Sequence, residues 1–487
     1  MTDSTSDPTA GPGTRHLDDR IEAVFGPLVD EIAAGAVARE RDRRLPVDEV
    51  DLLRRAGFGA LRVPVEHGGW GASLEQEFRL LVRLGTADSN LPQLLRGHVA
   101  FVETQRAQPD GPLRTEWLER LAAGDVLVGN AQAERGDATA VTTRLTEVDG
   151  RLRLDGRKFY STGTLYADWI WVGALRGDEP VALAVRADAP GVTRLDDWGG
   201  FGQRLTGSGT TIFDDVTVDP AQVLPWSDNA ERRPLAYTQA LYQLVLLAAE
   251  TGIARAVVHD AVDFVRPRTR TFGVAGVSLP REDPLVQGVV GRLSSIASAV
   301  EAVTLSAVRA LEAADGRASA AASASAAASV DASAPDGAST ADDDYQEALA
   351  TVFEAQQVVL PLVLEAATAL FEVGGASAVD ADRALDRHWR NARTIASHNP
   401  AIHRERALGD RRLNGTPFRT GPQAAAAAPA TPAAPTGPRR PAGPAGSAHP
   451  VGSESASRRF SARRGRRAGA DEVLVEPPAL DDGGGRR

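Results

Sequence analysis

The chain has 487 residues, enough for several structural units around a large buried core. Its 54 Lys and Arg against 65 Asp and Glu give a net charge of −11, which argues against general nucleic-acid or membrane-surface binding. Cysteine is absent, which excludes disulfides, thiolate metal sites, iron–sulfur clusters and cysteine nucleophiles. With no signal-peptide pattern at the N-terminus, we expect a soluble, cytoplasmic protein without a membrane-spanning segment or a metal site.

Three stretches of the sequence contain few large apolar side chains that could be buried. Residues 1–15 are rich in Ser, Thr, Gly and Pro, and residues 419–487 run through Ala/Pro-rich sequence into arginine clusters. We expect both to be disordered tails. Residues 314–342 are nearly all Ala, Ser, Asp and Gly, and they predict a flexible insertion, although an Ala-rich run also favours partial helix.

The remaining sequence changes its hydrophobic period twice. In residues 16–123 apolar side chains recur every three or four positions, which predicts a helical domain. Residues 124–232 alternate with a period of two and carry turn signals at Asp149-Gly150 and Asp155-Gly156, which predicts a β domain. Helical spacing returns in residues 233–418 and predicts a helix bundle. This order, without βαβ alternation, indicates an α+β protein and argues against a Rossmann domain.

Two glycine-rich elements invite a phosphate-binding interpretation. They are Gly207–Thr211 and Gly374-Gly375, and neither has the lysine of a P-loop. For the first, we favour a tight turn leading into a strand at Thr211–Phe213.

The histidines offer candidates for proton transfer. His98, His388, His398 and His403 remain once those in the tails or without polar neighbours in sequence are set aside. For any one of them, composition alone favours a hydrogen-bonded or exposed side chain over catalysis.

Longer motifs carry a resemblance that spacing does not give. They are Leu61-Arg62-Val63-Pro64 with Gly68-Gly69-Trp70-Gly71, Gly156-Arg157-Lys158-Phe159-Tyr160-Ser161-Thr162-Gly163, and Phe213-Asp214-Asp215-Val216. These segments resemble the acyl-CoA dehydrogenase superfamily. Gly202–Thr210 and Asp386–Thr394 resemble a narrower branch, the flavin-dependent monooxygenases typified by dibenzothiophene monooxygenase and the sulfur-acquisition oxidoreductases.

The resemblance implies an architecture. The family fold has an N-terminal helical domain, a central β-barrel and a C-terminal four-helix bundle, and it is usually a homotetramer. Placed on this chain, these parts are residues 16–123, 124–232 and 233–418, the last containing the insertion at 314–342.

One carboxylate separates the two chemistries of the superfamily. An acyl-CoA dehydrogenase needs a Glu base at one of two family positions. Here the commoner position holds Asn399, and the alternative, in the first bundle helix, aligns with Tyr242. Neither is a base at neutral pH, although a shifted alignment would bring in Glu250. We therefore favour oxygenation over dehydrogenation.

The resemblance also implies site residues. Ser161 matches the residue that hydrogen-bonds flavin N5, and Asn130 matches one at the edge of the isoalloxazine. His98 and His398 match positions near the flavin and are the expected proton-transfer groups. The other expected cofactor contacts are Trp198 (or Phe201) as a wall, Arg270 and Phe272 reaching a neighbouring subunit's flavin phosphate, Gly374, Gly375 and Arg393.

The expected function is a two-component monooxygenase. Reduced FMN from a separate NAD(P)H-dependent flavin reductase, with FAD as the alternative cofactor, would react with O2 to form a C4a-hydroperoxide. This would oxygenate a small hydrophobic substrate, for which an organosulfur compound is the first candidate. Two alternatives remain open: an FAD-dependent acyl-CoA dehydrogenase that reduces an electron-transfer flavoprotein, and a catalytically silent flavin-binding partner. The sequence departs from the branch at Ile395, often a second His, and at Asn399, often Asp.

Overall fold

The computed structural model describes residues 12–124, 126–135, 141–224, 235–270, 279–328 and 337–419. They all belong to one compact unit of the chain, Met1–Ala428. Most of the tails expected at 1–15 and 419–487, together with Phe272, lies outside the described residues.

The first third of the chain is helical, as its spacing predicts. The helices are α1 (Pro12–Asp42), α2 (Val47–Arg55), α3 (Leu74–Ala87), α4 (Asn90–Ala107) and α5 (Pro112–Ala122), with the short η1 (Phe58–Ala60) and η2 (Val65–His67). A capping box starts α3, because the Ser73 hydroxyl accepts from the Gln76 N–H and the Gln76 side chain accepts from the Ser73 N–H.

The middle of the chain forms one mixed sheet. Its elements are β1 (Val128–Ala131), β2 (Arg144–Val148), β3 (Arg151–Lys158), η3 (Thr164–Tyr166), β4 (Trp169–Arg176), β5 (Glu179–Arg186), β6 (Val192–Arg194), β7 (Thr211–Val218), η4 (Pro220–Gln222) and β8 (Val223–Leu224). The strand order is β6-β7-β3-β2-β4-β5-β8, and β1 pairs in parallel with β4. Ile170 and Val172 face a core within the sheet, whereas Trp171 between them joins the core of the helices.

Two expectations for this region are corrected. The described sheet is not a closed barrel, because its terminal strands β6 and β8 have three and two residues and do not pair with each other. Asp149-Gly150 is the turn between β2 and β3, as predicted. Asp155-Gly156 is not a turn, because it lies inside β3, where the register shifts at a bulge next to Gly156.

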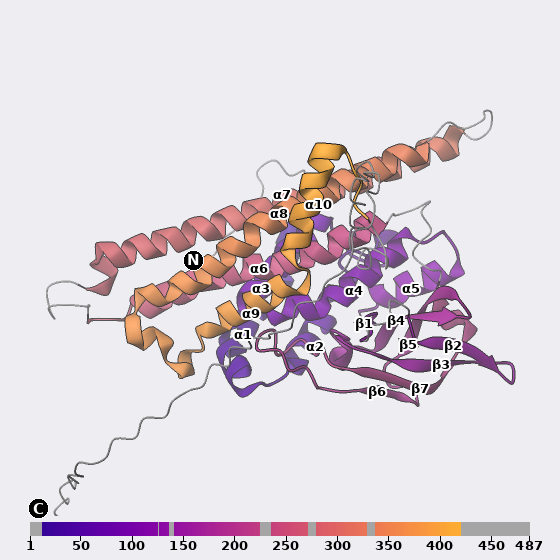
Figure 1. Ribbon diagram of the computed structural model, residues 1–487, viewed down its shortest axis with the longest axis horizontal. Coiled ribbons are helices and arrows are strands. Elements are labelled where there is room, and N and C mark those ends of the chain that lie inside the picture. The colour runs from indigo at the N-terminus through magenta and orange to yellow at the C-terminus, as the bar shows by residue number, and fades with distance from the viewer. Residues whose placement is uncertain are drawn as a thin grey trace, which may run out of the picture. The chain divides into compact units, whose positions relative to one another are not determined.

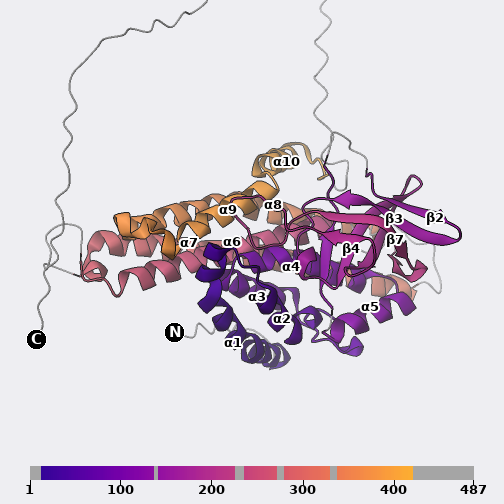
Figure 2. The ribbon, with the colours of Figure 1, turned by 90° about the horizontal axis from the view of Figure 1, so that it is seen from below.

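The last third is helical again. Its elements are α6 (Leu235–Val265), η5 (Pro280–Glu282), α7 (Pro284–Ala328), α8 (Gly337–Ala369), η6 (Leu370–Val373), η7 (Gly375–Val379), η8 (Ala381–Arg383), α9 (Asp386–His398) and α10 (Ala401–Asn414). The long helices α6, α7 and α8 lie side by side, and α9 packs on α6 and α8 (Figures 1 and 2). The expected insertion at 314–342 is helical at both ends, since α7 runs on to Ala328 and α8 begins at Gly337, as the helix preference of Ala favours.

The expectation that no segment is long and apolar enough to span a membrane was wrong. By length and composition alone, windows in α6, α7 and α8 reach that level. In α6, 83% of the window is buried inside the fold. Its apolarity on all sides therefore serves a helix surrounded by protein.

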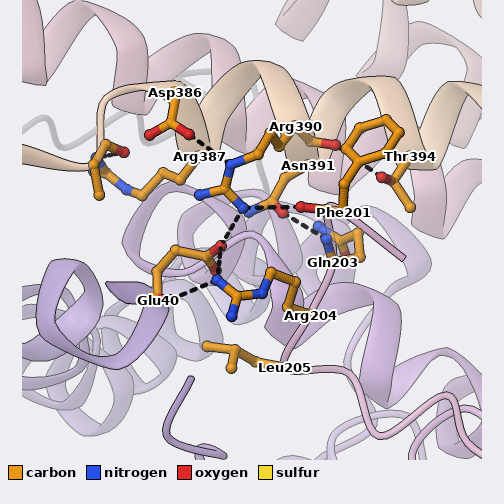
Figure 3. A network of polar contacts seen from close by, with 12 residues as sticks. Glu40, Phe201, Gln203, Arg204, Leu205, Asp386, Arg387, Arg390, Asn391 and Thr394 are labelled. Atoms are coloured by element: carbon orange, nitrogen blue, oxygen red, sulfur yellow. Dashed lines mark hydrogen bonds and ion pairs between the residues drawn. The ribbon is translucent and has the colours of Figure 1, made fainter. Parts of the chain in front are cut away.

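A polar joint connects α1, the loop after β6 and α9 (Figure 3). The carboxylate of Glu40, buried on α1, accepts from Arg390 on α9 at 2.8 Å. The same guanidinium donates to the Phe201 carbonyl at 2.9 Å, and Arg204 donates to the Glu40 carbonyl at 3.3 Å. The motifs Gly202–Thr210 and Asp386–Thr394, far apart in sequence, are thus two halves of one contact.

Amides complete this joint. The Asn391 side chain accepts from the Gln203 N–H at 2.6 Å and donates to the Ser89 hydroxyl at 3.0 Å, and all three residues are buried. A Cβ at Gly202 would collide with the carbonyl of Arg390, so only glycine fits there. The joint fixes the N-terminal half of α9, and His398 is the last residue of the same helix.

We predict that Arg390→Ala lowers the free energy of unfolding by about 3 kcal/mol, because the buried carboxylate of Glu40 loses its nearest cation. Arg412→Ala is the control: it removes an exposed ion pair with Glu354 and should cost about 0–1 kcal/mol. Urea denaturation measures both values. Equal losses in the two variants would contradict the role of this joint.

Candidate functional site

Ser161 lies in a tight turn after β3. Tyr160 just before it adopts a left-handed φ of 54°, unusual for an aromatic residue. The Ser161 N–H donates to the Gly209 carbonyl at 2.9 Å, and the Thr164 hydroxyl donates to the Ser161 carbonyl at 2.8 Å. The backbone is therefore held on both sides. The Ser161 hydroxyl is fully buried and has no hydrogen-bond partner among the described residues.

Asn130 on β1 lies beside this turn. Its N–H donates to the Thr162 carbonyl at 3.2 Å, and its side-chain amide makes no hydrogen bond within the described parts of the chain. A Cβ at Gly97 would lie 2.7 Å from the Cβ of Asn130, so glycine lets α4 pack closely on β1. The structure thus brings together Asn130 and Ser161, each with unused hydrogen-bonding capacity.

The glycine-rich loop before β7 supports the turn. The Ser208 hydroxyl hydrogen-bonds to those of Thr162 and Thr206, both at 2.8 Å. Thr210 donates through its N–H and its hydroxyl to the carboxylate of Asp197, each at 2.7 Å. Gly207 has a φ of 60°, and β7 begins at Thr211, which confirms the predicted strand; the turn lies earlier, at Arg204-Leu205. These hydroxyls already have partners, which disfavours phosphate binding.

Aromatic side chains lie next to Ser161. Trp198 meets Tyr160 edge to face with centroids 6.0 Å apart, and the Arg135 guanidinium lies 5.2 Å from the Tyr160 ring. Tyr160 is half exposed, so this group offers a ring surface beside the turn. Phe201, the other expected wall, instead stacks on Trp389 of α9.

His98 is enclosed by backbone. Its Nδ1 accepts from the Val128 N–H at 3.3 Å, and its Nε2 lies against Gly59. Burial lowers the pKa of His98 to about 4, against the smaller, opposing effect of the Gly59 backbone. The ring is therefore neutral and joins α4 to η1 and β1, a geometry that favours a structural role over the predicted proton transfer.

His398, at the end of α9, meets a cation. The Arg96 guanidinium on α4 donates to His398 Nε2 at 3.0 Å, and since arginine only donates, the imidazole proton is on Nδ1. His398 is exposed at the end of α9, and the charge of Arg96 beside its Nε2 is the main cause that lowers the pKa of His398. His398 is thus a neutral ring whose Nε2 lone pair is occupied.

The two dehydrogenase base positions lie close by. The Asn399 amide donates to Gln243 at 3.0 Å. Burial raises the pKa of Tyr242 to about 12, partly offset by Arg96. Glu250 is fully buried, and neither of its carboxylate oxygens has a partner among the described residues. Burial raises its pKa well above the usual range despite the charge of Arg393, so it is held neutral.

The remaining predicted residues lie elsewhere. Gly374 packs on Phe264, and its carbonyl accepts from Arg268 near the end of α6, two residues before the exposed Arg270. Gly375 follows with a φ of 54°. Arg393 donates to Ser397 on the solvent side of α9. None of these residues contacts the Ser161 turn within the described structure.

Three further residues near this region, His388, Arg96 and Gln243, were not among the predicted site residues. His388 donates to Asp260 at 2.7 Å; burial and then Arg387 keep the pKa of His388 low, and Asp260 stays ionised between the two. Sequence analysis missed Arg96 and Gln243. A signal for Arg96 was present, since it is a lone charge in the apolar helical stretch Leu94–Val99.

Comparisons with known proteins agree with this fold. Residues 244–401 match the family model of the acyl-CoA dehydrogenase C-terminal domain. The chain is 28% identical over 430 residues to dibenzothiophene monooxygenase of Rhodococcus qingshengii, covering 84% of this chain and 98% of that protein. It is 31% identical over 294 residues to L-evernosamine nitrososynthase of Micromonospora sp., covering 58% and 68%. FMN-bound TdsC from Paenibacillus sp. A11-2 superposes with a TM-score of 0.71 at 25% identity, covering 83% and 98%.

These matches span the helices and the sheet alike. The fold is of the acyl-CoA dehydrogenase class. Within that superfamily the chain belongs to the branch of flavin-dependent monooxygenases, as its motifs predict, and it is an oxidoreductase.

We predict that the free energy of unfolding of His98→Asn lies closer to that of the wild type at low pH than at neutral pH. The buried, neutral ring stabilises the fold above the ordinary histidine pKa of about 6.5, and this contribution is lost as pH falls toward 4 and the unfolded chain takes up the proton. Asn does not titrate. Between pH 7 and 4.5 the gap in unfolding free energy should shrink by about 2–3 kcal/mol. A constant gap would show that His98 is solvated.

We predict that acyl-CoA thioesters do not reduce the bound flavin. Asn399 and Tyr242 cannot remove the α proton, and Glu250 is held neutral in the core. Anaerobic titration of the flavin-loaded protein with short- to long-chain thioesters should leave the flavin absorbance unchanged, while dithionite bleaches it. Bleaching by any thioester would overturn the assignment.

Proposed function

We propose that this chain is a two-component monooxygenase. It takes reduced FMN from a separate NAD(P)H-dependent flavin reductase and transfers one atom of O2 to a small hydrophobic, organosulfur substrate. The observation that carries the proposal is the buried, unpartnered hydroxyl of Ser161 at the position where the family meets its flavin. The named activity of the dibenzothiophene monooxygenase relative supports the substrate class.

The residues present fit FMN. A buried hydroxyl without a partner is costly, and a flavin ring nitrogen or oxygen would satisfy it. The free amide of Asn130 would hydrogen-bond the ring edge, and Trp198 with Tyr160 would cover it. FMN, which the structural neighbour TdsC binds, is the cofactor, rather than the alternative FAD. When bound and reduced, it would supply oxygen activation by the C4a-hydroperoxide route of the branch.

The protein would position the flavin and exclude water from it. The Ser161 hydroxyl would hydrogen-bond flavin N5, from a turn whose backbone is fixed at Gly209 and Thr164. In a water-poor site such a fixed hydrogen-bonding group acts far more strongly than in water. His398 carries its proton on Nδ1, and with Nε2 occupied by Arg96 it would not take up a second proton at neutral pH.

We also propose a homotetramer in which two subunits complete each cofactor site. The expected contacts fall into two groups in one chain: Asn130 and Ser161 beside the sheet, and Gly374 with Arg270 near the end of α6. A flavin whose ring meets the first group and whose phosphate meets a neighbour's second group would use both. Arg270 offers the guanidinium that suits a phosphate. We place this assembly in the cytoplasm.

We predict that Ser161→Ala uncouples the reaction. Given reduced FMN, O2 and methyl phenyl sulfide, the variant should bind FMN and consume O2, yet release hydrogen peroxide, with the yield of sulfoxide per O2 falling on the order of 10²-fold. Product and peroxide are measured together by chromatography and a peroxidase assay.

Ser397→Ala, an exposed serine on α9, is the matched control and should behave as wild type. Near-normal coupling in Ser161→Ala would place the active site elsewhere. Tight FMN binding by the wild type without oxygenation of any sulfide would refute the proposed function and favour a silent flavin-binding partner.

A further inference from the structure

Arg96 is a buried cation without an anion. Its side chain is on α4 with 7% of the residue exposed, its Nη2 donates to His398, and its guanidinium lies 5.1 Å from the ring centroid of Tyr242. Its Nε has no partner, and no carboxylate of the described residues lies within ion-pair distance.

Other buried arginines of this fold differ in this respect. Arg39 is paired with Glu49 at 2.9 Å and with Asp88 at 3.2 Å, and Arg62 with Glu103 at 2.8 Å. A charge taken out of water is normally compensated in this way, because its desolvation is costly. Arg96 meets instead a neutral imidazole and a tyrosine ring. The fold therefore holds a desolvated positive charge with donor capacity to spare.

We propose that Arg96 binds an anionic group of the substrate, a carboxylate, sulfinate or sulfonate, where α4, α6 and α9 meet. Only the identification of the bound molecule as substrate rests on the proposed function. A guanidinium suits such oxyanions, because each presents two oxygens to its paired N–H donors. Gln93, three residues earlier on the same helix, is buried with an unpartnered side-chain oxygen; this oxygen only accepts hydrogen bonds, so it suits a donor group of the substrate and not the anion.

The neighbourhood of Arg96 favours a substrate anion over the phosphate of FMN. The next residue, Gly97, packs on Asn130, and the carbonyl of Leu94 lies against Gly163 in the Ser161 turn. Arg96 is thus in the helical turn that faces the ring-binding residues. The expected phosphate contact, Arg270, follows the end of α6 instead.

An anion here would also act on His398. The charge of Arg96 is the largest cause of the low pKa of that ring. A bound carboxylate or sulfinate would compensate the charge, so His398 would protonate more readily with substrate present. Substrate binding and the readiness of His398 to accept a proton are then linked.

The test is binding of small anions to the full chain loaded with FMN, by calorimetry. The probes are benzoate and benzenesulfinate, with benzamide and methyl phenyl sulfone as uncharged counterparts. We expect the anions to bind at least tenfold more tightly than their counterparts, and Arg96→Gln to abolish this preference. Arg96→Lys should retain part of it. Arg404→Gln, which removes a guanidinium stacked on Phe353 and not paired with a described carboxylate, is the control and should retain all of it.

FMN affinity and melting temperature distinguish a substrate site from a site for the phosphate of FMN. Arg96→Gln should change the affinity for FMN less than twofold and should not lower the melting temperature of the unloaded protein, because it removes an uncompensated charge. Equal binding of anions and neutral counterparts by the wild type would overturn the proposal. So would a tenfold loss of FMN affinity in Arg96→Gln without loss of riboflavin affinity, because the anion would then be the cofactor phosphate. None of these readouts needs turnover, so they stand even if the proposed oxygenation fails.

Discussion

The buried carboxylate of Glu40 is the contact on which the arrangement of the site depends. The carboxylate accepts a hydrogen bond from Arg390 on α9, and the backbone carbonyl of Glu40 accepts one from Arg204 in the loop after β6. Three parts of the chain that are remote in sequence are thereby held to one point (Figure 3). Because α9 is anchored there, its far end can present His398 to Arg96 without a direct link to the sheet.

Long, specific segments were predicted well from sequence. The α, β, α order followed from periodicity, and the turn at Asp149-Gly150 followed from its residue types. The end of the sheet and the bulge at Gly156 did not, because strand pairing depends on neighbours distant in sequence. The same reason applies to His98: the family resemblance implied proton transfer, and only the fold shows that the Val128 N–H faces one ring nitrogen and that Gly59 lies against the other.

The chemistry of the site depends on whether each buried polar or charged group has a partner within the fold. Glu40 and Arg62 are buried charges with opposite partners and serve the architecture. Ser161, in the turn after β3, and Arg96, where α4, α6 and α9 meet, are buried polar groups with unused capacity. The distinction was invisible in the sequence, because a residue type does not reveal its partners. Unfilled capacity of this kind is what a ligand completes.

The all-round apolarity of α6 affects how the chain is made. On the ribosome, α6 emerges long before α8 and α9, which cover it in the finished fold. Until synthesis has passed His398, a helix apolar enough to resemble a membrane segment lacks part of its covering. Chains that terminate early, or that pause within the Ala-rich stretch between α7 and α8, are therefore the species most prone to aggregate or to need chaperones.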